Sequence, residues 1–146
     1  MIEHGMKRTA GQLMHSIICI DPKATVAKAA QAMKKSNIGS IFVGDKEKPL
    51  GIFTERDVTR RVIADGLDPK KTKVSDVMTK KLVTADASES LDKVFDCLAE
   101  GQFRHLPITE NGKIVGIVSL TDLARVFREL YQDDQFLESF SDKIKS

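Results

Sequence analysis

The sequence predicts an α+β fold in which two copies of one β-α-β-β-α unit pack as a single module with pseudo-two-fold symmetry. The first observation is an internal repeat, because residues 25–33 match 90–98 and residues 51–57 match 116–122 in hydrophobic pattern. Both matches have the same offset of 65 positions, so no gap is needed between them. The second observation is that strand-like and helix-like apolar spacings follow one another in the same order in each copy.

Each copy is predicted to begin with a short apolar strand, over residues 16–20 and 82–85, followed by a polar turn. Thr25 and Ser90 then stand where a helix N-cap belongs, since a hydroxyl can accept hydrogen bonds from the free amides of a first turn. Apolar residues recur at i, i+3, i+4 and i+7 in each following helix, which predicts one buried face. These residues are Val26, Ala29, Ala30 and Met33 in the first copy, and Leu91, Val94, Phe95 and Leu98 in the second.

Two strands joined by a turn follow in each copy, over 40–43 with 50–53 and over 105–108 with 114–118. Asn111-Gly112 is a strong hairpin signal. A closing helix is expected to start near Glu55 and near Thr121. We therefore divide the chain into an N-terminal segment (1–15), a first repeat (16–64), a linker (65–80), a second repeat (81–128) and a C-terminal tail (129–146). The tail fits either a surface helix or a dimerisation element.

Composition narrows the function classes. With 23 Lys and Arg against 21 Asp and Glu, the net charge of +2 gives no strong attraction to nucleic acid or anionic membrane. No apolar run approaches the ~18 residues that span a bilayer, and no signal-peptide core is present, so we expect a cytoplasmic protein. Cys19 and Cys97 lack a second ligand at metal spacing and are expected to be buried thiols. No catalytic motif is recognisable, which favours a protein that is not an enzyme and has no catalytic cofactor.

One residue pattern in each copy suits a nucleotide. Thr54 and Asp57, and likewise Ser119 and Asp122, stand three positions apart where a strand is expected to meet a helix. A hydroxyl together with the free amides of a first helical turn suits a phosphate, and an aspartate suits a pair of ribose hydroxyls. The alternative is that each pair is a capping box, in which the hydroxyl and the carboxylate serve only the helix end. Capping and binding are compatible.

The chain resembles a pair of CBS domains, a Bateman module, over about residues 9–127. The residues that carry this resemblance are Gly-h-h-Thr/Ser-x-x-Asp in both copies (h, hydrophobic), Arg-His-Leu-Pro-Ile at 104–108, and Val-Ser-Asp-Val-Met at 74–78. The sequence of residues 51–57, followed by Arg-Arg-Val-Ile at 60–63, is similar to stand-alone bacterial and archaeal members. The resemblance implies that aspartates Asp57 and Asp122 hold ribose and that Thr54 and Ser119 lie near phosphates.

The resemblance also implies that Arg104 and His105 face a cleft between the repeats and meet phosphate. Their counterparts in the first copy are Gly39 and Ser40, so phosphate binding is not expected to be symmetric. Arg56 likewise corresponds to Thr121, which makes the two sites unequal. Weaker candidates for contacts to the base or phosphate are Gly39 and Ser40 themselves, Cys19 and Thr84 in the first strands, and the neighbouring turn residues Pro22 and Ala87. Core packing is the favoured interpretation of Cys19.

The function predicted from these observations is a ligand sensor. AMP, ADP, ATP, NAD or S-adenosylmethionine would bind in the cleft and signal by conformational change to an effector protein, and a homodimer is implied by the resemblance. One alternative is an interaction or dimerisation protein whose clefts bind nothing. The less favoured alternative is a nucleic-acid binder, which would use basic residues close in sequence: Arg56, Arg60, Arg61, Lys70, Lys71 and Lys73.

Overall fold

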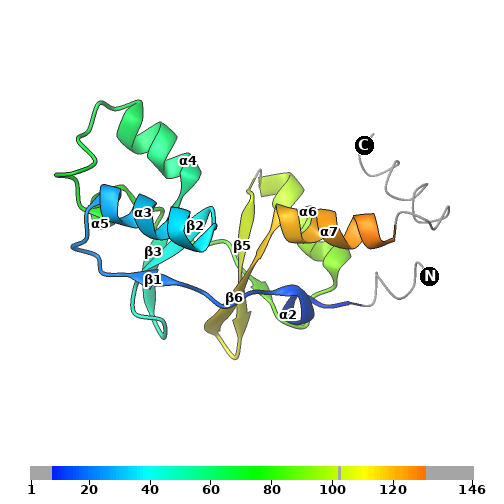
Figure 1. Cartoon of the computed structure of the whole chain (residues 1–146). Helices are drawn as coiled ribbons and strands as arrows, with labels where there is room; N and C mark the ends of the chain where they lie inside the picture. Colours follow the sequence, from blue (N-terminus) through cyan, green and yellow to red (C-terminus); the bar gives the residue numbers. More distant parts are fainter. Residues whose placement is uncertain (1–7, 102, 131–146) are drawn as a thin grey trace. The chain divides into compact units, whose positions relative to one another are not determined.

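The computed structural model describes residues 8–101 and 103–130 (Figure 1). The chain divides into two compact units. The first unit contains Ser16–Val83 together with Asn111–Val115. The second unit contains the described residues up to His15, then Thr84–Glu110 and the described residues from Gly116 on. Each unit has a small sheet and helices, which confirms the predicted α+β fold with two repeats.

The sheet of the first unit has the order β1-β2-β3. Strand β1 (Cys19–Ile20) runs parallel to β2 (Ser40–Gly44), which pairs antiparallel with β3 (Pro49–Thr54). The first strand was expected over residues 16–20 and is shorter in the structure, because only two of its residues pair along β2. Residues Ile41, Phe42 and Val43 of β2 are all buried, so this strand is covered on both faces.

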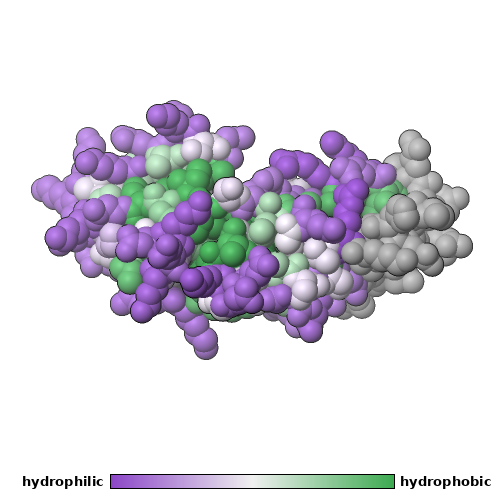
Figure 2. Space-filling model, turned by 90° about the horizontal axis from the view of Figure 1, so that it is seen from below, coloured by the Kyte–Doolittle hydropathy of each residue, from purple (hydrophilic) through white to green (hydrophobic). Residues whose placement is uncertain are grey.

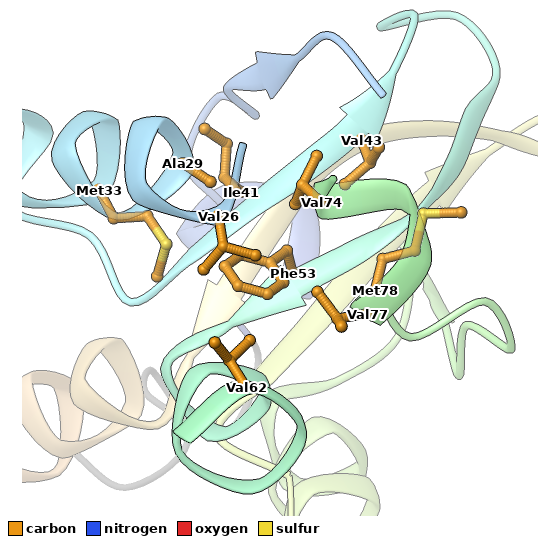
Figure 3. Packing of buried hydrophobic residues seen from close by; sticks show 10 residues of the cluster. All are labelled: Val26, Ala29, Met33, Ile41, Val43, Phe53, Val62, Val74, Val77 and Met78. Atoms are coloured by element: carbon orange, nitrogen blue, oxygen red, sulfur yellow. The ribbon is translucent and has the colours of Figure 1, made fainter. Parts of the chain in front are cut away.

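Over the described residues, the first unit has four helical elements. They are α3 (Val26–Ser36), a short α4 (Glu55–Asp57), a π-helix η1 (Val58–Ile63) and α5 (Val74–Val77). The hydroxyl of Thr25 accepts a hydrogen bond from Lys28 N at 3.2 Å, so the predicted N-cap is confirmed. Helix α3 buries Val26, Ala29 and Met33, whereas Ala30 is only half-buried. Figure 3 shows the core that results, which consists of Val26, Ala29, Met33, Ile41, Val43, Phe53, Val62, Val74, Val77 and Met78.

Residues Val74, Val77 and Met78 of this core come from the interval that the sequence analysis assigned to the linker. Val74 is fully buried, and its backbone N–H donates to the carbonyl of Ala24 at 2.8 Å. This part of the interval is therefore an integral layer of the first unit.

The closing helices of the two repeats differ in pitch. In the first unit, Ala64 N donates to Thr59 O at 3.0 Å, five positions back, which defines a π-turn. In the second unit, α7 (Leu120–Glu129) is α-helical throughout. The buried residues Val62 and Val126 stand 64 positions apart rather than 65. The wide π-turn thus accommodates one extra residue of the first copy.

The second unit contains α2 (Ala10–Leu13), β4 (Ala85–Asp86), α6 (Leu91–Gly101), β5 (His105–Glu110), the part of β6 (Lys113–Ser119) from Gly116 on, and α7. The strand order is β4-β5-β6, with β4 parallel to β5. The first strand was expected over 82–85, but its two pairing residues are Ala85 and Asp86. Asn111 and Gly112 have φ angles of 53° and 77°, as a two-residue hairpin turn requires, so the hairpin prediction is confirmed.

Helices α6 and α7 pack through Phe95 and Phe127, whose ring centroids are 5.5 Å apart in an edge-to-face arrangement. Phe95 is half-buried, while Leu91, Val94 and Leu98 of the predicted stripe are buried. Of the expected tail 129–146, only residues 129 and 130 are among those described.

Hydrophobic side chains also reach the surface of the first unit, where Figure 2 shows them among hydrophilic residues. Exposed apolar residues of this unit include Ile18, Leu50, Ile63 and Leu67. Within the described ranges, no helix has both the length and the apolar character needed to cross a bilayer.

Candidate functional site

The first motif (residues 51–57) places Thr54 and Asp57 at the junction of β3 and α4. Oδ2 of Asp57 accepts hydrogen bonds from the backbone N–H of Thr54 at 2.9 Å and from its hydroxyl at 3.2 Å. In return, the Thr54 hydroxyl accepts from the backbone N–H of Asp57 at 3.3 Å. This is a reciprocal capping box. The capping interpretation of the motif is therefore confirmed, and it holds Asp57 at only 5% exposure.

The other oxygen of this carboxylate has partners from more distant parts of the chain. Oδ1 of Asp57 accepts from the hydroxyl of Thr79 at 3.0 Å and lies 3.5 Å from Nε of Arg61. Arg61 is itself positioned by a 2.9 Å hydrogen bond from Nη1 to the carbonyl of Met78. Thr79 is aligned by two backbone hydrogen bonds with Ile52 in β3. Hydrogen bonds to backbone atoms of other residues thus position both Arg61 and Thr79 beside Asp57.

The second motif (residues 116–122) repeats this arrangement at the junction of β6 and α7. Oδ2 of Asp122 accepts from the backbone N–H and the hydroxyl of Ser119, both at 2.8 Å. Asp122 N donates to the Ser119 hydroxyl at 3.2 Å, which completes the capping box. Oδ1 lies 2.6 Å from Nε2 of His15 and 3.4 Å from Nη1 of Arg125. Asp122 is 3% exposed.

His15 and Thr79 occupy corresponding places in the two units. His15 exchanges two backbone hydrogen bonds with Ile117, at 2.9 and 3.0 Å, as Thr79 does with Ile52 at 2.8 and 2.9 Å. We call residues 8–15 and 73–79 the leading segments, because each precedes one repeat in the sequence. Each leading segment contacts the motif of the other repeat: His15 precedes the first repeat and contacts the second motif, and Thr79 does the converse.

Neither His15 nor Thr79 is among the site residues predicted from the sequence. A signal was available, because Met14-His15 aligns with Met78-Thr79 at an offset of 64, one less than the offset of the repeats. That shift hides the correspondence when a single offset is applied to the whole chain.

The glycine that opens each motif is explained by the leading segments. A Cβ on Gly51 would lie 2.6 Å from the carbonyl oxygen of Thr79 and 2.9 Å from Sδ of Met78. A Cβ on Gly116 would lie 2.5 Å from Sδ of Met14 and 2.9 Å from the carbonyl oxygen of His15. Only glycine leaves room for a leading segment against the strand.

The charge of Asp122 is favoured by its surroundings. Burial by itself would raise the pKa of Asp122. The hydrogen bonds from Ser119 and His15, together with the positive charge that His15 can carry, outweigh burial and hold the pKa below its ordinary value. Asp122 is therefore an ionised acceptor at neutral pH.

The first-turn amides, which the sequence predicts to be free for a phosphate, are partly occupied. The N–H of Glu55 donates to Gly39 O at 3.1 Å, and the N–H of Leu120 donates to Arg104 O at 2.8 Å. These equivalent bonds confirm that Gly39 and Arg104 are counterparts. They also place Arg104, which is exposed, directly beside the second motif.

The remaining predicted residues lie around these junctions. Arg56 and Thr121 are exposed in the first turns of their helices, whereas His105 is half-buried at the start of β5. Ser40, the counterpart of His105, is buried at the start of β2 with 8% exposure. Within each unit, the structure thus brings the strong candidate residues to one strand-to-helix junction.

The weaker candidates have structural roles. Pro22 and Ala87 accept backbone hydrogen bonds from the leading segments, from Ser75 N at 3.3 Å and Gly11 N at 2.9 Å. Thr84 is exposed. Cys19 lies in β1 and is half-buried, as is Cys97, so both thiols are less buried than expected and neither forms a disulfide. Burial raises the pKa of the Cys19 thiol, with a smaller opposing effect from Lys46.

The first unit also has a pocket of about 390 Å³ beside the first motif, between the end of α3 and the start of α4. Its lining residues are Ala30, Met33, Lys34, Asn37, Ile38, Gly39, Glu55 and Val58. Among residues 8–101 and 103–130, no group of three or more His, Cys, Asp or Glu side chains is arranged to hold a metal ion.

Comparison with known proteins gives consistent results. The CBS domain family profile matches residues 10–64 and 74–129. The CBS domain-containing protein YhcV of Bacillus subtilis is 38% identical over 108 residues, which cover 74% of this chain and 76% of that protein. An uncharacterized conserved protein from Pyrococcus horikoshii has a similar crystal structure, with a TM-score of 0.79 and 35% identity over 84% of this chain and 94% of that one.

A putative signal-transduction protein with CBS domains from Burkholderia ambifaria is also similar in structure, with a TM-score of 0.72 and 30% identity. That match covers 84% of this chain and 89% of the other. Each of the two stretches matched by the family profile contains most of one leading segment, one small sheet and one Gly-h-h-Thr/Ser-x-x-Asp motif. The chain therefore belongs to the CBS domain family and carries two CBS repeats.

Proposed function

We propose that this CBS pair is a regulatory ligand sensor, which binds an adenosine-containing molecule at its Thr/Ser-x-x-Asp motifs and passes the binding event to an effector protein. Modules of this family are generally non-catalytic and bind adenosyl ligands, and the proposal contains no catalytic step. The observation that supports it most is the nearly buried aspartate that follows a hydroxyl residue at the same strand-to-helix junction of both repeats.

The chemistry of each junction suits different parts of the ligand. Asp57 and Asp122 are acceptors for the two hydroxyls of a ribose. Arg104, exposed beside the second motif, supplies a cation with a planar set of donors for phosphate. Because the hydroxyls of Thr54 and Ser119 already donate to their aspartates, either would have to rotate before it could donate to a phosphate.

The two motifs are expected to bind with different affinities. The second has Arg104 and His105, where the first has Gly39 and Ser40, so a phosphorylated ligand is expected to favour the second motif. Arg56, which aligns with Thr121 of the second copy, is the cation within the first motif. The ligand candidates remain AMP, ADP, ATP, NAD and S-adenosylmethionine.

The first test is a thermal-shift series with these five ligands and GTP, followed by calorimetry. A ligand at about 100 times its dissociation constant stabilises the fold by roughly 2.7 kcal/mol, which gives a visible shift. Shifts with adenine ligands but not with GTP support the proposal. An absence of shifts with all six ligands would contradict it and favour an interaction module without a ligand.

The second test assigns the site. Asp57→Ala and Asp122→Ala should each weaken binding of the ligand found in the first test, whereas Glu47→Ala, which changes an exposed turn residue, should not. Unchanged affinity in both aspartate variants would refute the site assignment.

A cytoplasmic homodimer completes the proposal, and light scattering of the full chain with and without ligand tests its oligomeric state. The nucleic-acid alternative predicts instead that binding of DNA or RNA weakens steeply with salt.

A further inference from the structure

The carboxylate of Asp122 has no acceptor position to spare. A carboxylate offers about four lone-pair positions. Two on Oδ2 are taken by the N–H and hydroxyl of Ser119, and Oδ1 has His15 at 2.6 Å and Arg125 at 3.4 Å. A ribose diol that binds this carboxylate must therefore displace a donor that is already in place.

The donors differ in how readily they can leave. The two donors from Ser119 belong to the capping box of α7, so displacing them would remove the N-cap of this helix. The side chains of His15 and Arg125 are 59% and 60% exposed, so both can turn toward water and be solvated. Oδ1 is thus the oxygen for which a ligand can compete, and His15 makes the shorter contact.

We propose that His15 competes with the ligand for Oδ1 of Asp122, and that its protonation makes the affinity of the second motif depend on pH. This proposal rests on the proposed function. In the first motif, the same place is held by Thr79, whose neutral hydroxyl donates to Oδ1 of Asp57 at 3.0 Å. The affinity of the first motif is therefore independent of the protonation of its leading segment.

The sign of the effect follows from the charges. A protonated imidazole makes a charge-assisted hydrogen bond to the carboxylate, which is stronger than the bond from a neutral imidazole. Among the described residues, His15 faces the charged Asp122, whose Oδ1 also has Arg125 of α7 at 3.4 Å, while Ile117 on β6, which pairs with the backbone of His15, is apolar. Raising the pH deprotonates His15, weakens the competitor and strengthens ligand binding.

Adenosine is the probe, because it has a ribose diol and no phosphate that titrates near neutral pH. Its affinity is measured by calorimetry at about pH 5.5 and about pH 8, on either side of the ordinary histidine range. Asp57→Ala isolates the second motif and Asp122→Ala isolates the first. AMP is measured in parallel. Its affinities are compared only between variants of one background at the same pH, so that the ionisation of the phosphate cancels.

In the Asp57→Ala background, we expect adenosine to bind about five- to tenfold more tightly at the higher pH. Adding His15→Gln, which keeps a neutral donor, should bring the ratio of the affinities at the two pH values close to one. Adding His15→Ala should raise the affinity for adenosine at the lower pH. The matched control is Arg8→Gln. It removes the 3.1 Å ion pair between Arg8 and Glu129, another tie of the same leading segment to α7, and should leave the ratio intact. In the Asp122→Ala background, the ratio should be close to one.

The outcomes separate the two proposals. If adenosine and the five adenine ligands of the thermal-shift series bind no variant, including His15→Ala, the proposed function fails and the competition fails with it. If binding depends on Asp122 but its pH ratio survives His15→Gln, the competition alone is overturned. A ratio lost equally in Arg8→Gln would also overturn it, because the effect would then come from loosening of the segment.

Discussion

The hydroxyl of Thr79 donates to Oδ1 of Asp57 over 3.0 Å, although 22 positions separate the two residues in the chain. The bond ties the segment before the second repeat to the motif of the first. The contact of His15 with Asp122 makes the corresponding tie in the second unit. Each motif aspartate is therefore at once part of a helix cap, part of a tertiary contact and a candidate ligand group.

Removal of the Thr79 hydroxyl should destabilise the protein. Thr79→Val keeps the shape of the side chain but leaves Oδ1 of the nearly buried Asp57 without this donor. The expected loss is about 1–2 kcal/mol in the free energy of unfolding, measured by urea denaturation. Thr59→Val is the control, because the Thr59 hydroxyl bonds an exposed helical carbonyl at 3.3 Å. Equal effects of the two substitutions would argue against a structural role for the Thr79–Asp57 bond.

Enlargement of Gly51 should be more damaging than enlargement of a turn glycine. The Cβ of Gly51→Ala would meet the backbone carbonyl of Thr79 at 2.6 Å, so strand β3 or the leading segment must move. We expect a loss of about 2–3 kcal/mol. Gly112→Ala has open space and only its φ of 77° to oppose it, so about 1 kcal/mol is expected. Denaturant midpoints of both variants measure the difference, and the reverse order would refute the close-approach argument.

The interval between the repeats should behave as core. Val74→Ala removes two methyl groups from a fully buried position and should cost about 1.5–2.5 kcal/mol in unfolding free energy. Val83→Ala is the matched control, because Val83 is 42% exposed and its truncation should change stability by less than about 0.5 kcal/mol. Similar losses in the two variants would show that residues 74–78 do not pack as described.

Acid should remove the stabilising contribution of Asp122. Its pKa is lower in the folded protein than its ordinary value, so the unfolded state takes up a proton more readily. The contribution is complete above the ordinary aspartate range near pH 4 and is lost as the pH falls through the folded-state pKa. Asp122→Asn should therefore be less stable than the wild-type protein at neutral pH, and the gap should narrow on acidification. Urea midpoints measured across this range test the prediction, and a constant gap would contradict it.

The sequence predicted features that depend on local signals. The repeat at one offset, the caps at Thr25 and Ser90, and the Asn111-Gly112 hairpin follow from patterns within a few residues, and the structure confirms them. The motif residues were placed at their strand-to-helix junctions for the same reason. What these residues bind stays a prediction.

Features that depend on tertiary contact were missed. The roles of His15 and Thr79 come from segments that dock far from their own repeats in sequence, which no local periodicity encodes. The π-turn in η1 was also unforeseen, because an extra residue in an amphipathic helix leaves a pattern close to that of an ordinary helix. The first strands are shorter than their apolar runs because strand length is set by pairing with a neighbour and not by hydrophobicity alone.

Each leading segment packs against the repeat that it does not precede, and this limits which fragments of the chain can fold. A fragment that covers only residues 16–64 would lack Val74, Val77 and Met78, and with them part of the interior of its own unit. A fragment that starts at residue 81 would likewise lack Ala10, which is fully buried in the second unit. The smallest fragment with a complete core is thus the tandem of both repeats. A gene duplication or a designed fusion that copies one repeat alone would lack part of the hydrophobic core.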